Sequence, residues 1–172
     1  MAVAYMPLSF LPYVMTDAIT DIQPQWLKDQ NIRLLMLDFD NTIVPYTTCA
    51  PTEAVENWLD RMLHSDITVC IVSNSRKDRV PKFCQERGLH CITHAKKPFS
   101  KGIQECLTKF QIPASQAALV GDQIFTDTLG ANGCGARAIL VKAIDNHNFW
   151  LKARHVLEMP FILLAKNRRL SQ

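Results

Sequence analysis

The sequence predicts an α/β fold: a Rossmann-like, doubly wound parallel sheet with helices on both faces, in three layers. Three observations lead to this prediction: apolar runs of strand length recur along the chain, helical stretches separate them, and polar clusters follow the runs. Apolar runs without alternating polar residues are typical of strands that are buried on both faces. A regular alternation of such strands with helices favours parallel neighbours joined by crossover connections.

Each element has its own signal in the sequence. Five apolar runs are expected to form strands, at residues 33–38, 67–72, 90–93, 117–121 and 137–141. Four stretches between them are expected to form helices, near residues 52–64, 77–87, 100–110 and 124–133. Thr52 and Ser100 are candidate first residues of two helices, and Gly88 is the expected end of another. A last helix near 147–158 should end before Pro160, because proline cannot continue a regular helix.

The length of 172 residues suits one domain, so a single domain over residues 1–172 is expected. Its motif-bearing core spans about residues 30–141, between an apolar lead-in (1–15) and a basic C-terminal helix and tail (about 147–172). The lead-in carries no charged side chain. It is too short to span a bilayer as a helix, and two prolines interrupt it. It is expected to pack on the core, the alternative being a contact with a membrane interface.

The composition limits the class of protein. Hydrophobic residues make up 48% of the chain and charged residues 20%, which is typical of a globular protein. The net charge of +3 is too small to indicate a nucleic-acid partner, although the C-terminal quarter is basic and suits either an anionic surface or a solubilising tail. The six cysteines form no CxxC pair, and no secretion signal is evident, so we expect a cytoplasmic protein without a disulfide framework or a zinc site.

Four polar clusters follow the predicted strands at their carboxyl ends. They are Asp38 to Thr42, Ser73 to Ser75, Lys96 to Pro98, and Gly121-Asp122 with Asp127 behind it. Open α/β sheets bind their ligands at the carboxyl ends of the strands, so these clusters should meet at one edge of the sheet. We therefore expect the functional site there.

The residue types in these clusters suit phosphate-ester hydrolysis. Two buried carboxylates one residue apart, Asp38 and Asp40, repel each other, and a divalent cation such as Mg²⁺ together with a phosphate group would offset that cost. One carboxylate can attack phosphorus to form an aspartyl-phosphate, and the other can transfer the proton of the leaving group and of the attacking water. Ser73, Asn74 and Lys97 could hold the phosphoryl oxygens while charge spreads over them.

The segments "DFDNT", "VSN", "KKP" and "GDQIFTD" resemble, in order and spacing, the four motifs of the haloacid-dehalogenase-like phosphatases. The resemblance covers about residues 30–141. The patterns "GDQ..TD" and "A.KP" resemble more narrowly the YqeG-type phosphatases of subfamily IIIA, which are related to mitochondrial and plastid phosphatidylglycerophosphate phosphatases.

This resemblance implies a role for each matching residue. Asp38 would be the nucleophile, and Asp40 would be the general acid and base and would offer its backbone carbonyl to Mg²⁺. The predicted metal ligands are therefore Asp38, Asp40 and Asp122, with Asp127 as a supporting acid. The predicted phosphate-binding residues are Thr42, Ser73, Asn74 and Lys97.

The spacing of the motifs predicts that no cap domain covers the site. The stretches from Thr42 to Ser73 and from Ser73 to Lys97 leave room for a helix and a strand each, but not for a cap. An open site suits a phosphate presented by a large partner, such as a lipid headgroup. The uncharged N-terminal stretch and the basic C-terminal stretch fit a peripheral contact with an anionic membrane at its inner face.

Several assignments have alternatives. Asp127 could instead neutralise Lys97, Asn74 could only fix its loop, and Lys96 competes with Lys97 for the phosphate role, although the following Pro98 favours Lys97. The function predicted is Mg²⁺-dependent hydrolysis of phosphatidylglycerophosphate. The alternatives are a soluble phosphatase for a sugar phosphate, nucleotide or phosphoprotein, and a non-catalytic regulatory or nucleic-acid-binding module. The presence of both Asp38 and Asp40 speaks against a non-catalytic module, and no nucleic acid is expected.

Overall fold

The computed structural model describes residues 9–48, 50–145 and 149–170, with only the backbone over residues 149–155. Its centre is a six-stranded parallel sheet in the order β1-β6-β5-β2-β3-β4. The strands are Val14–Thr16 (β1), Leu34–Leu37 (β2), Thr68–Val72 (β3), His90–Ile92 (β4), Ala117–Gly121 (β5) and Arg137–Val141 (β6). The doubly wound α/β fold predicted from the sequence is confirmed.

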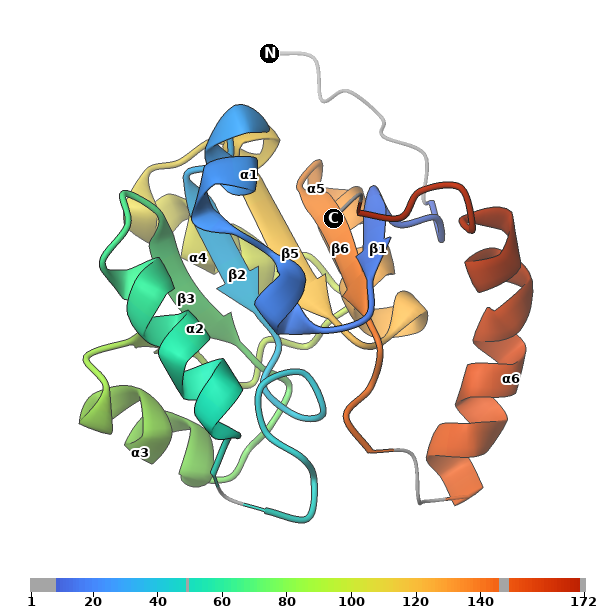
Figure 1. The fold of residues 1–172 in the computed structure, drawn as a ribbon, viewed down its shortest axis with the longest axis horizontal. Coiled ribbons are helices and arrows are strands. Elements are labelled where there is room, and N and C mark those ends of the chain that lie inside the picture. The colour runs from blue at the N-terminus through green and yellow to red at the C-terminus, as the bar shows by residue number, and fades with distance from the viewer. Residues whose placement is uncertain (1–8, 49, 146–148, 171–172) are drawn as a thin grey trace.

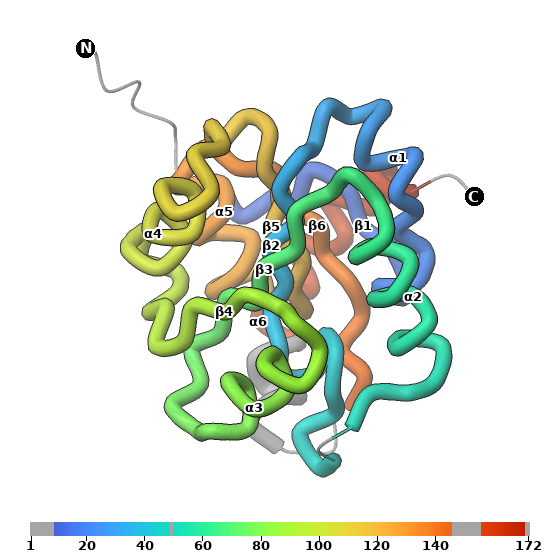
Figure 2. The backbone as a smooth tube through the Cα atoms, turned by 90° about the vertical axis from the view of Figure 1, so that its left-hand side faces the viewer, coloured from blue at the N-terminus to red at the C-terminus, as the bar shows by residue number. Residues whose placement is uncertain are grey.

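Helices cover both faces of the sheet. The α-helices of the described residues are Pro24–Asp29 (α1), Glu53–Leu63 (α2), Arg79–Glu86 (α3), Lys101–Phe110 (α4), Leu129–Cys134 (α5) and Phe149–Leu164 (α6). In Figure 1, α2 and α3 lie in front of the sheet and α4 and α5 behind it. Figure 2 shows the sheet from its edge, between α1 and α2 on one side and α4 and α5 on the other. The three-layer arrangement follows from these two views.

Strand β2 shows why the apolar runs form central strands. Leu35 and Leu37 belong to the core beneath α1, α2 and α3, whereas Leu34 and Met36 belong to the core beneath α4 and α5. Successive side chains of a strand point to opposite faces, so a strand between two helical layers needs an apolar residue at every position. All four residues are fully buried.

Helix α2 follows the expected helical pattern. Thr52 accepts a hydrogen bond at its side-chain oxygen from the backbone N–H of Val55, as its position before the helix predicted. The buried face includes Trp58, whose indole N–H donates to the backbone oxygen of Ile22 over 2.7 Å. This hydrogen bond ties α2 to the segment that leads into α1.

The order of the strands places a topological switch point between β2 and β5. From β2 the chain moves outward through β3 to β4, and it then returns to the other side of β2 to form β5 and β6. The loops after β2 and β5 therefore separate in opposite directions and leave a crevice between them, where ligands bind in open α/β sheets. Within the described residues, α2 is the one helix between β2 and β3, and α3 the one between β3 and β4.

The N-terminal lead-in differs from its prediction in one respect, because residues 14–16 form an edge strand that no sequence signal indicated. β1 pairs with β6, and Phe10 packs between the rings of Phe125 and Phe161. Residues 9–16 thus pack on the core, as expected for the lead-in, while its first eight residues lie outside the described part. The short helix α1 was also not predicted.

Two predicted helices have other limits in the structure. The stretch 124–133 is a π-helical turn, Ile124–Thr128, followed by α5. The prediction that the last helix ends before Pro160 is wrong, because α6 continues to Leu164. Phe161 and Ala165, beyond the proline, pack against the β1 and β6 edge, and this packing outweighs the backbone hydrogen bond that proline cannot make. Among the described residues, none of the helices has the length and apolar character needed to span a bilayer.

Candidate active site

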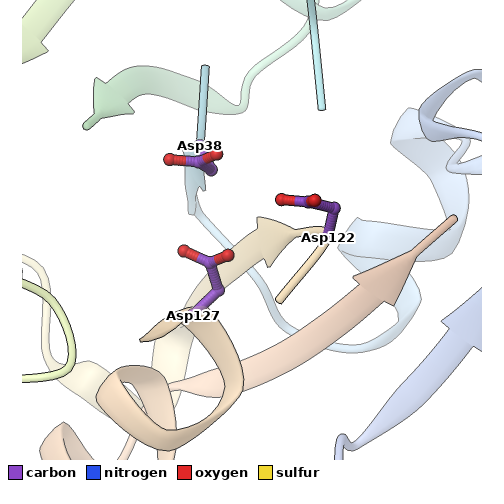
Figure 3. Close-up of side chains that lie close together, drawn as sticks. All are labelled: Asp38, Asp122 and Asp127. Atoms are coloured by element: carbon purple, nitrogen blue, oxygen red, sulfur yellow. The ribbon is translucent and has the colours of Figure 1, made fainter. Parts of the chain in front are cut away.

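The carboxylates of Asp38, Asp122 and Asp127 converge at the switch point. Asp38 directly follows β2, Asp122 directly follows β5, and Asp127 lies in the π-helical turn. One oxygen atom from each carboxylate lies within 4.8 Å of the other two, and all three residues are buried. Figure 3 shows the three side chains directed toward one common region. This arrangement is a set of hard oxygen ligands suited to a divalent cation.

Asp127 reaches this cluster because of Gly121 and the π-helical turn. A Cβ atom at Gly121 would overlap with the carboxyl group of Asp127, so the last residue of β5 must lack a side chain. The Asp127 carboxylate also accepts a hydrogen bond from the backbone N–H of Gln123 over 3.2 Å. Single π-helical turns are frequent at functional sites, and here the turn brings an acid back against the strand that precedes it.

Lys97 lies between two of these carboxylates. Its Nζ atom is 2.6 Å from Asp38 Oδ1 and 2.7 Å from Asp127 Oδ1, and its side chain is 1% exposed. Asp122 adds a third buried carboxylate to this cluster. A bound cation would offset the repulsion between the carboxylates.

Burial and the neighbouring charges together shift the pKa values of Asp38 and Lys97. The pKa of Asp38 is raised to about 6, and burial is the largest cause. The negative charge of Asp127 also raises this pKa, whereas the positive charge of Lys97 lowers it. Burial alone lowers the pKa of Lys97, but the charges of Asp127 and Asp38 outweigh it, so that this pKa is raised and the ammonium group stays charged. Lys97 is therefore a permanent positive charge beside the predicted nucleophile.

Asn74 and Lys97 hold each other in place. The Asn74 amide donates to the backbone oxygen of Lys97 over 2.9 Å, and its side-chain oxygen accepts from the backbone N–H of Lys97 over 2.7 Å. Both ends of the amide are thus engaged with the Lys97 backbone. This geometry favours the alternative in which Asn74 fixes the loop rather than holding phosphate. Lys96, the competitor of Lys97, is exposed, has a left-handed backbone conformation and is not among the residues that line the cavity containing Lys97.

The two predicted phosphate-binding hydroxyl residues, Ser73 and Thr42, differ in their position relative to the cavity that contains Asp38. Ser73 is buried, lines the same cavity as Asp38, and accepts at its Oγ a hydrogen bond from the backbone N–H of Ser75 over 3.1 Å. Its hydroxyl proton remains available to a ligand oxygen. Thr42 is buried too, but within the described residues it does not line this cavity.

Asp40 is separate from the three-carboxylate cluster. Its carboxylate forms an ion pair with Arg79, the first residue of α3, whose guanidinium group also lies 5.3 Å from the centre of the Phe39 ring. Among the described acids, the carboxylates brought together are those of Asp38, Asp122 and Asp127, rather than that of Asp40. Sequence reasoning did not identify Arg79. The basic run after Ser75 was the one available signal.

A cavity of about 400 Å³ opens above these groups. Asp38, Asp40, Ser73 and Lys97 contribute to its wall, together with the basic segment that leads into α3. The predicted site residues from three separate loops therefore share one cavity at the carboxyl edge of the sheet.

Comparison with known proteins agrees with this geometry. The family model described as mitochondrial PGP phosphatase matches residues 1–144. The chain belongs to this phosphatase family. It is also 33% identical over 132 residues to the probable phosphatase YqeG of Bacillus subtilis, an alignment that covers 77% of each protein. The family resemblance and the phosphatase activity predicted from the four motifs are thereby confirmed.

Solved structures share the fold of this PGP phosphatase family member. A putative hydrolase of haloacid-dehalogenase subfamily IIIA from Legionella pneumophila superimposes with a TM-score of 0.50 at 14% identity, covering 82% of this chain and 87% of that one. The 3-deoxy-D-manno-octulosonate 8-phosphate phosphatase of Moraxella catarrhalis was solved with magnesium, phosphate and the sugar KDO. It superimposes with a TM-score of 0.50 at 17% identity, and the alignment covers 85% of this chain and 95% of that one. At these identities the likeness concerns the fold.

Proposed function

We propose that this phosphatase hydrolyses phosphatidylglycerophosphate to phosphatidylglycerol and phosphate, in a Mg²⁺-dependent reaction that forms an aspartyl-phosphate on Asp38. The observation that carries the proposal is the convergence of Asp38, Asp122 and Asp127 at the switch point, where Lys97 pairs with Asp38 and Asp127. The family match supports the substrate, since the family is described as PGP phosphatase.

The residues present fit a magnesium ion. Mg²⁺ uses few protein carboxylates and keeps several waters, and the cluster offers three buried carboxylates whose oxygen atoms lie within 4.8 Å of one another. Asp38, Asp122 and the backbone carbonyl of Asp40 would hold the ion, while Asp127 holds Lys97. A related fold, that of the Moraxella phosphatase, was solved with magnesium and phosphate. When bound, the ion supplies positive charge to the phosphoryl oxygens.

The protein side chains account for the two chemical steps. Asp38 attacks phosphorus while Asp40 gives a proton to the leaving glycerol oxygen, which releases phosphatidylglycerol. Asp40 then takes a proton from a water that attacks the aspartyl-phosphate, and this restores Asp38 and releases phosphate. Lys97 and the Ser73 hydroxyl hold the phosphoryl oxygens as charge develops on them. In the structure Arg79 forms an ion pair with Asp40, which favours the ionised carboxylate that accepts the proton of the water in the second step.

The substrate proposal is tested by comparing kcat/KM for phosphatidylglycerophosphate with kcat/KM for soluble sugar phosphates, nucleotides and a phosphopeptide, in Mg²⁺. We expect the lipid phosphate to be preferred by at least about tenfold, which corresponds to about 1.4 kcal/mol of transition-state binding. The variant Asp38→Asn controls for contaminating phosphatases. Equal or greater activity on a soluble ester would replace the lipid by that class of substrate.

We also propose that α6 contacts an anionic membrane and keeps the enzyme peripheral at its inner face. Four large apolar side chains of this helix are exposed by 60–72%: Val156, Leu157, Leu163 and Leu164. Their spacing places them on one face of the helix. Lys166 and Arg169 follow and are exposed, so apolar and cationic groups lie together, as in interfacial helices.

The membrane contact is tested by sedimentation with vesicles that contain anionic lipid. Leu163→Glu/Leu164→Glu should reduce the bound fraction, because it places two charges in the apolar face. Leu63→Glu, at an exposed leucine of α2, is the matched control and should bind as the wild type does. Equal binding of the α6 double variant and the wild type would refute this contact.

A further inference from the structure

The wall of the active-site cavity contains two cations that the proposed chemistry does not use. Arg76 and Lys77 line the same cavity as Asp38 and Lys97, and both are exposed. The other two basic residues of the wall are engaged: Lys97 pairs with Asp38 and Asp127, and Arg79 pairs with Asp40. Within the described residues, neither Arg76 nor Lys77 forms an ion pair.

The backbone that carries these cations is well anchored. The Ser75 side chain accepts a hydrogen bond from the backbone N–H of Lys77 over 3.2 Å, and Ser73 accepts one from Ser75 in the same way. The backbone N–H of His94 donates to the Ser75 backbone oxygen over 3.3 Å, which ties this loop to the segment after β4. The two cations therefore start from a fixed position beside the acids, and their long side chains can reach into the open part of the cavity.

The cavity is larger than one phosphate group requires. At about 400 Å³ it falls within the range of small-molecule sites, which is roughly 300–1,000 Å³. Among its lining residues Asp38 and Lys97 are buried, whereas Arg76 and Lys77 are exposed. A ligand with one phosphate at Asp38 would leave the two exposed cations facing solvent, whereas a second anionic group a few bonds away would pair with them.

We propose that Arg76 and Lys77 form a binding site for a second phosphate group of the substrate, next to the phosphate that is hydrolysed. This inference rests on the proposed function, and it specifies which part of the substrate the enzyme recognises. The phosphodiester of phosphatidylglycerophosphate is one group with this chemistry, and the second phosphate of a soluble sugar bisphosphate is another. Both are tetrahedral anions, which arginine and lysine bind through charge-assisted hydrogen bonds.

The experiment measures selectivity rather than activity alone. kcat/KM is determined for water-soluble short-chain phosphatidylglycerophosphate, for a sugar bisphosphate and for glycerol 3-phosphate, which has no second phosphate. The readout is the ratio of each two-phosphate substrate to glycerol 3-phosphate. Arg76→Gln/Lys77→Gln should lower this ratio by about tenfold or more, the effect of one or two charge-assisted hydrogen bonds. In the wild type the ratio should also fall as ionic strength rises, since these cations are exposed.

Two control variants separate a local effect from a change of net charge. Arg61→Ala/Lys82→Ala removes two exposed cations outside the cavity and should leave the ratio as in the wild type. Arg76→Lys/Lys77→Arg keeps both charges and should keep most of the selectivity.

Each outcome decides the inference. A lower ratio for both two-phosphate substrates supports a general second-phosphate site, and a lower ratio for the lipid analogue alone assigns the site to the phosphodiester. A ratio that does not change in the Gln double variant, or that falls equally in the Arg61/Lys82 control, overturns the inference while the phosphatase activity itself stands. A wild-type enzyme that hydrolyses none of the three substrates removes the proposed function and this inference together.

Discussion

Replacing Gly121 by alanine tests whether the position of Asp127 matters for both stability and activity. The added methyl group would occupy the space of the Asp127 carboxyl group, so that side chain must move. Its movement would weaken the ion pair with Lys97, which is now 2.7 Å long and buried on both sides. The perturbation therefore acts on the site through one neighbour, without removing any of the predicted catalytic groups.

The magnitude follows from two costs. Forcing an extra methyl group into a packed region costs about 1–3 kcal/mol, and breaking a buried ion pair costs about 3–5 kcal/mol. Since Asp38 remains beside Lys97, only part of the second cost applies, and we expect the free energy of unfolding to fall by about 2–4 kcal/mol. A displacement of about 1 Å in the site should lower kcat/KM by about 10²-fold.

The assays are urea denaturation and hydrolysis of a chromogenic phosphate ester. Gly88→Ala is the matched control, because Gly88 has a φ of +64° and no atom within 4 Å of an added Cβ. It should cost about 1 kcal/mol of stability through backbone strain and leave kcat/KM unchanged. In an Asp127→Gly background, the methyl group at position 121 meets no carboxylate, so Gly121→Ala should cost less there than in the wild type. Equal costs in the two backgrounds, or wild-type activity in Gly121→Ala, would refute this reasoning.

Four further predictions concern the charges of the site. Asp38→Asn should abolish turnover yet raise the melting temperature of the metal-free protein, since it removes a buried carboxylate whose pKa is raised to about 6; a lower melting temperature would contradict this. For the same reason the folded metal-free protein holds a proton that the unfolded chain releases near pH 4, so its free energy of unfolding should fall as the pH rises from about 4 to about 6. If Asp38 is a ligand of the proposed Mg²⁺ site, the ion would bind its ionised form, so the Mg²⁺-induced increase in melting temperature should be larger at pH 7 than at pH 5. An equal increase at both would argue against Asp38 as a ligand. Arg79→Ala should lower kcat by about tenfold or more, with partial recovery in Arg79→Lys, if Asp40 depends on this ion pair; unchanged kcat would remove that role from Arg79.

Much of the fold could be predicted because its signals are local. Strands such as Leu34–Leu37 are buried on both faces, so each residue carries the same apolar signal regardless of its partners. Strand β1 lacked such a signal: it has three residues, and it exists because residues 14–16 pair with residues 139–141, far along the chain. The prediction of where α6 ends was wrong for a similar reason. Local proline chemistry predicted a stop at Pro160, and distant packing against Phe10 and Met15 overrode it.

The candidate site could be predicted as a list of residues at one edge of the sheet, but not as a set of contacts. Motif order placed Asp38, Asp122 and Lys97 together, since the strands that carry them are neighbours or nearly so. The pairing of Asp40 with Arg79 depends on where α3 begins and how it approaches the loop after β2. The contact of Asp127 with Lys97 was expected from the sequence only as an alternative, because it depends on a π-helical turn that has no distinct sequence pattern. Such contacts arise from the angles between elements, and residue order does not encode them.

The site combines a destabilising charge arrangement with a rigid frame, and the two features depend on each other. Lys97 pairs with two of the three buried carboxylates, and burial, together with the neighbouring Asp127 charge, raises the pKa of Asp38 to about 6. The carboxylates could lower their energy by moving apart into solvent, but each is fixed by its backbone: Asp38 and Asp122 follow two adjacent central strands, and Asp127 rests against Gly121. A protein that cannot relieve this repulsion by moving can relieve it by binding positive charge. The fixed backbone of the sheet edge would therefore favour cation binding by these three acids, and loosening that edge should weaken the proposed metal binding even when every acid is retained.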